Sequence, residues 1–215
     1  IEHWNVKPDM ICMAKALSGG FVPVGAVAMT QQIMDSVFNR MDRAVVHGST
    51  FSKNNMAMAA GLACLEVVRT EKLVENSAII GADIINRLNA LTGQFEFLKE
   101  ARGKGSMIAI EFKSPSSLSL KAAWVMLEAA NKGLFCQMIT IPLFKEHRIL
   151  TQVAGHGMNV VKLLPPLILT QKDRDHIISA FTKTIADTHQ VPGSIWELGK
   201  NLASHALKAK QAKSS

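Results

Sequence analysis

The sequence predicts an α/β protein, in which the end of a parallel-sheet domain is followed by a smaller α+β domain. The first part places a short apolar strand, 10–14, before a strongly apolar helix, 54–70. Beyond it, strands and helices follow one another in an order typical of α+β domains. With 48% apolar and 19% charged residues, the chain can bury a sizeable core.

The first part, residues 1–75, is expected to carry two paired strands. The strand 10–14 suits a buried parallel sheet, and 26–29 follows it across the turn Ser18-Gly19-Gly20. Thr30 is the expected N-cap of a short helix, and 44–46 a strand fragment. The helix 54–70 is apolar on most sides, so we expect it to be buried within the protein or at an interface.

The second part, residues 76–192, is expected to form the small domain, and 193–215 a basic helical or disordered tail. The boundary between the domains is placed on the helix at 71–91, near residue 75. Apolar spacing and glycine or proline stops define the remaining elements. The expected strands are 95–98, 107–112, 134–139 and 160–164, and the expected helices are 118–132 and 170–188.

Lys15 stands directly after the first strand. A lysine is almost never fully buried unless it is paired, so one at the tip of a core strand is expected to point at a ligand or a reacting group. Burial lowers the pKa of an amine, which suits Schiff-base chemistry. In the alternative, the stem packs at the strand end and the amine reaches solvent. The local sequence by itself favours this alternative.

The loop 47–52, His-Gly-Ser-Thr-Phe-Ser, is rich in hydroxyl groups and precedes the helix 54–70. Such a loop before a helix N-terminus offers backbone N–H groups, hydroxyls and a favourable dipole to an anion. Ser49 and Thr50 are therefore candidate phosphate ligands. The alternative is that they simply cap the helix.

Charge and composition argue against several classes of partner. The formal net charge is +7, but four lysines of the last sixteen residues supply much of it, and the absence of tyrosine gives no support to a basic and aromatic nucleic-acid surface. No apolar run approaches the roughly 18 residues that span a bilayer. We therefore expect neither a nucleic acid nor a membrane as partner. The four lysines are Lys200, Lys208, Lys210 and Lys213.

The cysteines indicate the compartment. Cys12, Cys64 and Cys136 are odd in number, far apart and set in apolar sequence. They are expected to be reduced core residues, and neither a disulfide nor a metal site is predicted. No secretory signal leads the sequence, and a cytoplasmic location is expected.

Four motifs together carry a family resemblance. The chain resembles the class III aminotransferases, pyridoxal-phosphate enzymes of fold type I that include ornithine, acetylornithine and 4-aminobutyrate transaminases. The resemblance covers residues 1 to about 190, and the order of the motifs makes it specific although each motif alone is weak. The motifs are PDMICMAKALSGGFVPVGAV at 8–27, HGSTFSKNNMAMAAGLACLEVV at 47–68, RGKGSMIAIEF at 102–112 and VVKLLPPLILT at 160–170.

The resemblance implies an aminotransferase that moves an amino group from an amine or amino-acid donor to a 2-oxo acid. Lys15 matches the lysine that carries pyridoxal 5'-phosphate as a Schiff base and moves the substrate proton. Ser49 and Thr50 match the loop that reaches the cofactor phosphate of the neighbouring subunit, which implies a homodimer with shared active sites. Residues 1–75 then end the large cofactor-binding domain, and the small domain closes over the substrate.

Two departures from the family pattern matter. Lys162 stands where several ornithine-type members have an arginine for a substrate carboxylate. Lysine keeps the charge but lacks the bidentate fork. The family's cofactor-ring carboxylate, stacking aromatic and glycine-rich phosphate cup precede the lysine. Since the chain begins at Ile1, we expect it to be the C-terminal portion of a longer protein, holding part of an active site.

A second hypothesis is a noncatalytic fragment or subunit that keeps the fold for dimerisation or partner binding. Arg102, between strands, is a candidate substrate contact, but a turn residue on a solvated hairpin is the preferred interpretation. Nucleic-acid binding through the basic tail is a third and weaker hypothesis.

Overall fold

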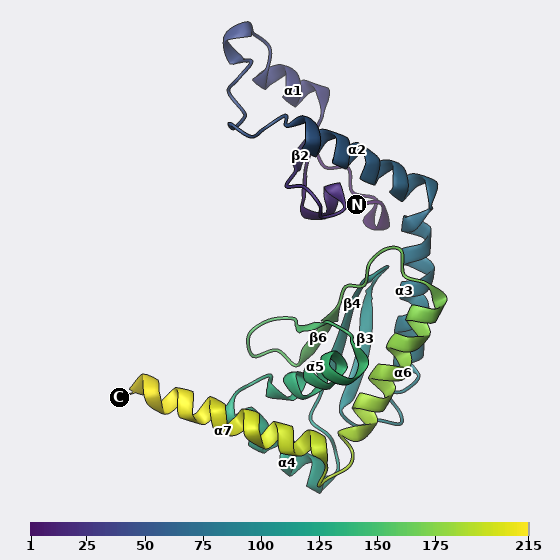
Figure 1. Cartoon of the computed structure of the whole chain (residues 1–215), viewed down its shortest axis with the longest axis vertical. Helices are drawn as coiled ribbons and strands as arrows, with labels where there is room; N and C mark the ends of the chain where they lie inside the picture. The colour runs from purple at the N-terminus through teal and green to yellow at the C-terminus, as the bar shows by residue number, and fades with distance from the viewer. Residues whose placement is uncertain (215) are drawn as a thin grey trace. The chain divides into compact units, whose positions relative to one another are not determined.

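The computed structural model describes residues 1–214, without the side chains of residues 2, 210, 213 and 214 (Figure 1). The chain forms two compact units, Ile1–Leu73 and a second unit that begins at Val74. Each unit is described by itself.

The first unit contains a two-stranded antiparallel sheet. Strand β1 (Met10–Ala14) pairs with β2 (Gly25–Met29), with Met10 opposite Met29 and Ala14 opposite Gly25. The short 3-10 helix η2 (Lys15–Ser18) follows β1. Gly19 and Gly20 come next in the connection to β2, with φ of +69° and +84°. Glycine adopts such angles without steric cost. The other helical elements of this unit are η1 (Glu2–Trp4), α1 (Gln31–Val37), η3 (Met41–Arg43) and α2 (Asn55–Thr70).

The pairing of the two strands across the glycine turn is as expected, but the surroundings of β1 are not. We expected a buried parallel strand. Met10 is 51% exposed, because the described sheet has two strands and no layer of the unit covers it. The strand fragment expected at 44–46 is also wrong. These residues follow η3 in turns, and Val45 is 85% exposed, without a neighbouring strand to pair with.

Helix α2 buries only a narrow face within its unit. Ala57 and Gly61 are buried, whereas Met56 and Leu62 on other sides are each 70% exposed. Burial within the protein therefore holds for the small residues, and for the large ones the expected interface stays a prediction. Large apolar side chains that are left exposed on one helix are typical of an interaction surface.

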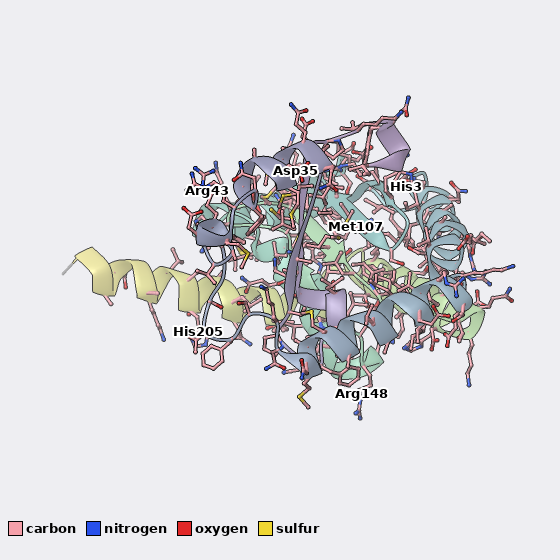
Figure 2. All side chains as sticks on the ribbon, turned by 90° about the horizontal axis from the view of Figure 1, so that it is seen from above. His3, Asp35, Arg43, Met107, Arg148 and His205 are labelled. Carbon is pink, nitrogen blue, oxygen red and sulfur yellow. The ribbon has the colours of Figure 1, made fainter. Side chains whose placement is uncertain are left out.

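The second unit is built on a four-stranded antiparallel sheet in the order β3-β4-β6-β5. Buried residues of β4 and β6, among them Ile110 and Val161, line one face, against which the helices pack. The other face carries most of the charged side chains of the sheet and is largely half-buried or exposed; Met107, labelled in Figure 2, is 63% exposed there. The strands are β3 (Leu98–Lys104), β4 (Met107–Phe112), β5 (Gln152–Val153) and β6 (Val160–Leu163).

The helices of this unit enclose an aromatic core. The rings of Phe97 and Phe135 lie 4.6 Å apart, and Trp124 and Phe135 lie 4.9 Å apart. Helices α3 and α6 run side by side (Figure 1), joined by the ion pair of Arg87 and Asp175 at 2.5 Å. The five helices are α3 (Leu73–Asn89), α4 (Leu118–Ala130), α5 (Leu134–His147), α6 (Gln171–Asp187) and α7 (Ser194–Ser214).

The segment expected as a strand at 134–139 is the first half of helix α5. A short apolar run fits a buried strand and a buried helix equally well, and here the helix continues to His147 through Pro142. Gly133 begins it with a φ of +83°. The helix packs against α4, α6 and α7, and Phe135, Met138 and others on several sides are fully buried. Burial on several sides explains why its sequence shows no clear helical period.

The segment expected as a tail at 193–215 begins inside the core of the second unit. Ile195, Trp196 and Ala203 of α7 are buried, and the indole of Trp196 donates a hydrogen bond to the carbonyl of Thr188 at 2.9 Å. A Cβ atom at Gly199 would lie 2.6 Å from the sulfur of Met138, so a glycine allows this close packing. Beyond Ala203, most of the described side chains of the helix are exposed in the manner of a tail.

The hairpin of β3 and β4 rests directly on α3. The expected strand at 95–98 starts later, at Leu98, and runs through Arg102 to Lys104. At the tip, the Ser77 hydroxyl accepts the backbone N–H of Ser106 at 2.8 Å. Gly81 faces Gly105, and a Cβ atom at Gly81 would lie 2.0 Å from the Gly105 carbonyl oxygen. Close backbone contact therefore fixes the hairpin on the helix.

Replacing Gly81 by alanine should lower the free energy of unfolding by about 1–3 kcal/mol, since the methyl group meets a backbone carbonyl that cannot move aside. Urea unfolding followed by circular dichroism measures the effect. Gly93→Ala is the matched control, because no atom lies within 4 Å of its added Cβ. Equal stability of the two variants would contradict the described contact.

Candidate active site

Lys15 opens the turn η2 with an unusual backbone conformation. Its φ is +57°, in the left-handed region that lysine rarely occupies, at a cost of order 1 kcal/mol. The side chain is exposed in the first unit, so the expected burial at a strand tip is wrong there. Its amine has no hydrogen bond or ion pair with the residues that the structure describes. Lys15 thus presents an unpaired amine from a fixed backbone position.

The turn behind Lys15 is held by Ser18. This serine is 2% exposed, and its hydroxyl donates to the carbonyl of Val22 at 2.5 Å and accepts the Val22 N–H at 3.2 Å. The N–H of Gly19 donates to the carbonyl of Ala16 at 2.9 Å. A buried polar group that is fully satisfied stabilises one local conformation. The strand, the lysine and the glycine turn therefore form one ordered segment.

Helix α2 supports this segment with three small residues. Ala57, Gly61 and Cys64 recur at helical spacing and lie on one face. An added Cβ at Gly61 would lie 3.9 Å from the carbonyl oxygen of Leu17, and the Cys64 thiol donates to the carbonyl of Ala16 at 3.5 Å. The small side chains let the helix backbone approach η2 closely. The motif at 47–68 thus supports the lysine turn through packing.

Ser49 lies at a small hollow of about 290 Å³ in the loop before α2. His47 and Lys53 line the same hollow, and the Ser52 hydroxyl accepts the backbone N–H of Ser49 at 3.1 Å. Thr50 is exposed beside it and does not line the hollow. Lys53 was not among the candidate residues identified from the sequence, although a lysine directly after a hydroxyl-rich loop is a signal for anion binding. The hollow combines a cation with hydroxyl groups, which suits an anion.

The helix N-terminus itself is capped by Asn54. The side-chain oxygen of Asn54 accepts the N–H groups of Met56 at 2.9 Å and Ala57 at 3.2 Å. The interpretation of Ser49 and Thr50 as simple helix caps is therefore wrong. So is the expectation that these helix N–H groups are free for an anion. Asparagine ranks at least as high as serine and threonine at this position and stands directly before the helix.

Lys162 projects from β6 on the open face of the second unit's sheet. Its neighbours Val161 and Leu163 are buried on the core face, so alternation along the strand directs Lys162 to the other side. Across the strands it faces Ala109 on β4 and Gln152 on β5. Its amine has no ion pair among the described side chains.

Arg102 lies in the same row of the sheet but its charge is neutralised. It forms ion pairs with Glu100 at 2.9 Å and with Glu111. Lys99 also pairs with Glu111 at 2.6 Å, and the hydrogen bonds from Lys99 and then Arg102 lower the pKa of that carboxyl group. Arg102 belongs to strand β3 and not to the hairpin turn, and its exposed ion pairs agree with the interpretation as a surface residue.

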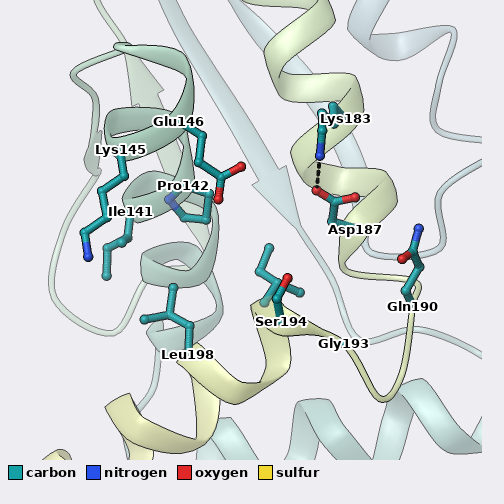
Figure 3. Close-up of a pocket in the computed structure, with 11 residues that line it drawn as sticks. Ile141, Pro142, Lys145, Glu146, Lys183, Asp187, Gln190, Gly193, Ser194 and Leu198 are labelled. Carbon is teal, nitrogen blue, oxygen red and sulfur yellow. Dashed lines mark hydrogen bonds and ion pairs between the residues drawn. The ribbon is translucent and has the colours of Figure 1, made fainter.

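The candidate residues are divided between the two units. Lys15, Ser49 and Thr50 belong to the first unit, and Lys162 belongs to the second. A further hollow of about 350 Å³ lies between α5, α6 and α7 of the second unit, beside the ion pair of Lys183 and Asp187 at 2.8 Å (Figure 3). None of the candidate residues lines it.

The cysteines differ in their surroundings. Cys136 is buried, and burial raises the pKa of its thiol to about 12. Cys64 is half-buried and Cys12 exposed, so the expectation of three core cysteines holds fully for Cys136 alone. Within residues 1–214, the structure shows no cluster of His, Cys, Asp or Glu that would hold a metal ion. None of the helices described there is long and apolar enough to cross a membrane.

Comparison with known proteins decides the family. The model of the family "Aminotransferase class-III" matches residues 1–185. The chain belongs to the class-III aminotransferases. The resemblance seen in the four sequence motifs is thereby confirmed, and α7 lies beyond the matched residues.

Individual relatives agree with this assignment. The chain is 34% identical to alanine–glyoxylate aminotransferase 2 homolog 2, mitochondrial, of Arabidopsis thaliana, over 83% of the chain and 34% of that protein. It is 38% identical to the mitochondrial ornithine aminotransferase of the same plant, over 62% of the chain and 27% of that protein. The structure of ornithine aminotransferase from Toxoplasma gondii matches with a TM-score of 0.70 and 28% identity, over 87% of the chain and 38% of that structure. The chain thus spans about a third of the length of these proteins.

Replacing Asn54 by alanine should destabilise the start of α2 by about 1 kcal/mol, because two backbone N–H groups lose their acceptor. Hydrogen exchange of the Met56 and Ala57 amides measures this directly and should accelerate several-fold. Ser49→Ala is the control, since the Ser49 hydroxyl makes none of the cap bonds. Faster exchange in Ser49→Ala, with no change in Asn54→Ala, would contradict the described cap.

Proposed function

We propose that the protein carrying this chain is a pyridoxal-phosphate-dependent aminotransferase that moves an amino group from an amine or amino-acid donor to a 2-oxo acid. Membership of the class-III aminotransferases is the observation that carries the proposal. The Toxoplasma gondii ornithine aminotransferase, which shares the fold, is described with partial occupancy of PLP at its active site. In this proposal, the first unit ends the large cofactor-binding domain, and the second unit is the small domain.

The residues of the first unit fit such a cofactor. The amine of Lys15 is unpaired among the described residues and stands on an ordered turn, as a covalent attachment point requires. The hydroxyls of Ser49 and Thr50 are likewise without hydrogen-bond partners in the described part of the chain. Lys53 adds a positive charge beside Ser49. The amine of Lys15 therefore suits an aldehyde, and the loop with Ser49, Thr50 and Lys53 suits a phosphate.

The chemistry divides between the cofactor and the chain. When bound, pyridoxal phosphate supplies the electron sink that weakens the bonds at the substrate α-carbon. Lys15 would provide the amine that anchors the cofactor, and the same amine, when free, would accept a proton from the substrate α-carbon and deliver it to the cofactor carbon C4'. The ordered backbone at Ser18 and Gly19 fixes the position from which the Lys15 side chain projects.

Ser49 and Thr50 are proposed to bind the cofactor phosphate of a neighbouring subunit, in a homodimer with shared active sites. Two observations support this: the exposed loop carries unpaired hydroxyls, and α2 exposes large apolar side chains such as Leu62. We also propose a cytoplasmic location, although the two plant relatives are named as mitochondrial. The cysteines free of disulfides support a reducing compartment.

Lys162 is proposed to bind a substrate carboxylate. It is the unpaired cation of its row on the open sheet face, where Arg102 is already engaged by two glutamates. A lysine recognises the charge of a carboxylate as a point charge, without the two parallel hydrogen bonds of an arginine. Specific binding of the carboxylate by Lys162 would therefore need a second hydrogen-bond donor beside it.

Borohydride reduction of the cofactor-loaded protein should fix the cofactor on the peptide that contains Lys15, because reduction makes the bond between the lysine amine and the cofactor permanent. Peptide mass spectrometry locates the label. Lys15→Ala should lose the label, whereas Lys7→Ala, a lysine of the preceding loop, should keep it. Label on another lysine in the unaltered protein would overturn the assignment of Lys15.

The same experiment separates the enzyme from a noncatalytic subunit that keeps the fold for dimerisation or partner binding. After incubation with saturating pyridoxal phosphate and removal of the free cofactor, a noncatalytic subunit would show no label and no absorbance of protein-bound cofactor. An enzyme would show both, and Ser49→Ala combined with Thr50→Ala should weaken cofactor retention without moving the label from Lys15.

A further inference from the structure

We propose that Gln152 is a second ligand of the substrate carboxylate and acts together with Lys162. This inference rests on the proposed function, in which Lys162 binds that carboxylate. It adds a residue that stands outside the four family motifs, on the edge strand β5.

Gln152 and Lys162 are direct cross-strand neighbours. They are partners in the antiparallel register of β5 and β6, so their side chains leave the same face of the sheet with Cβ atoms about 5 Å apart. Both line a hollow of about 320 Å³, whose other lining residues are Leu150, Thr151 and Leu164. The amide of Gln152 makes no hydrogen bond with the described residues. The unpaired amide of Gln152 and the unpaired amine of Lys162 therefore line the same hollow.

The edge strand that carries Gln152 is fixed to its neighbour. The hydroxyl of Thr151 donates to the backbone carbonyl of Lys162, and the N–H of Ala154 donates to the carbonyl of Val160 at 2.8 Å. These bonds hold the strand on both sides of Gln152. The separation between the Cβ atoms of Gln152 and Lys162 is thus set by the backbone, and the side-chain rotamers decide how far apart the amide and the amine lie.

On the open sheet face, the positive charge of Lys162 is not neutralised by a neighbouring acidic residue. Glu100 and Glu111 occupy the row beside Arg102 and neutralise it. Lys162 has Ala109 on one side, which offers neither charge nor a hydrogen bond, and Gln152 on the other. An anion that approaches the face meets an unpaired ammonium group with a neutral donor beside it.

The pair supplies what a single lysine lacks. A carboxylate has two oxygens, and an arginine binds both with a planar fork of two N–H groups. An ammonium group on one oxygen and an amide N–H on the other present the same two donors from adjacent strands. The hollow should therefore select ligands that carry a carboxylate over those that carry a neutral amide.

The test measures, by calorimetry, the Kd of the cofactor-loaded protein for glutarate, an unreactive dicarboxylate. Glutaramide, in which both acid groups are neutral amides, is the reference ligand. Gln152→Met removes the amide at nearly constant volume. It should raise the Kd for glutarate about tenfold, which is the usual effect of one hydrogen bond to a charged group. Gln152→Glu should weaken binding further through its negative charge.

Two other variants complete the comparison. Gln94→Met is the matched control on an exposed loop of the same unit and should leave the Kd unchanged. Lys162→Met should weaken glutarate binding most, and adding Gln152→Met to it should cause less loss than in the unaltered protein, because the two residues share one ligand. Glutaramide binding should respond to neither substitution.

The outcomes distinguish the inference from the proposed function. A Kd for glutarate that depends on Lys162 but is the same in Gln152→Met and Gln94→Met overturns the role of Gln152 alone. A Kd that is unaffected by Lys162→Met overturns both the carboxylate role of Lys162 and this inference. Neither result bears on the borohydride label at Lys15, which tests the aminotransferase chemistry separately.

Discussion

The packing of helix α2 against the turn η2 is the contact on which the proposed chemistry depends. Ala57, Gly61 and Cys64 form a narrow face of small residues, and this face lets the helix backbone lie close to the segment that opens with Lys15. Larger side chains at these positions would push the helix away from the turn. Because Lys15 itself is exposed and in a strained conformation, its position comes from the backbone around it.

The second unit contributes a different kind of order. Its sheet places ionic side chains on one face and the aromatic core on the other, with alternation along each strand. On the ionic face, Glu111 engages both Lys99 and Arg102, whereas Lys162 has no acidic partner among the described residues. The same alternation buries Val161 and Leu163. One register therefore determines both the core and the proposed carboxylate site.

The sequence predicted the parts of this structure that carry a clear local signal. The pairing of β1 with β2 followed from the glycine turn, and the helices at 118–132 and 170–188 followed from their apolar spacing. The failures have physical causes. Helix α5 is buried on several sides, so its sequence shows no periodic spacing of apolar residues. The N-cap of α2 is Asn54, although Ser49 and Thr50 looked equally suitable in the sequence. The neighbours of Lys162 depend on strand register across long sequence separations, which local patterns do not reveal.

The most direct measurement of the central claim is hydrogen exchange at the Gly19 amide, which bonds to the Ala16 carbonyl within the Lys15 turn. Gly61→Leu forces a branched side chain toward the backbone of Leu17 and should accelerate this exchange at least tenfold. Leu62→Ala, on an exposed side of the same helix, should leave it unchanged. Unchanged exchange in Gly61→Leu would show that α2 does not hold the turn and would contradict the account.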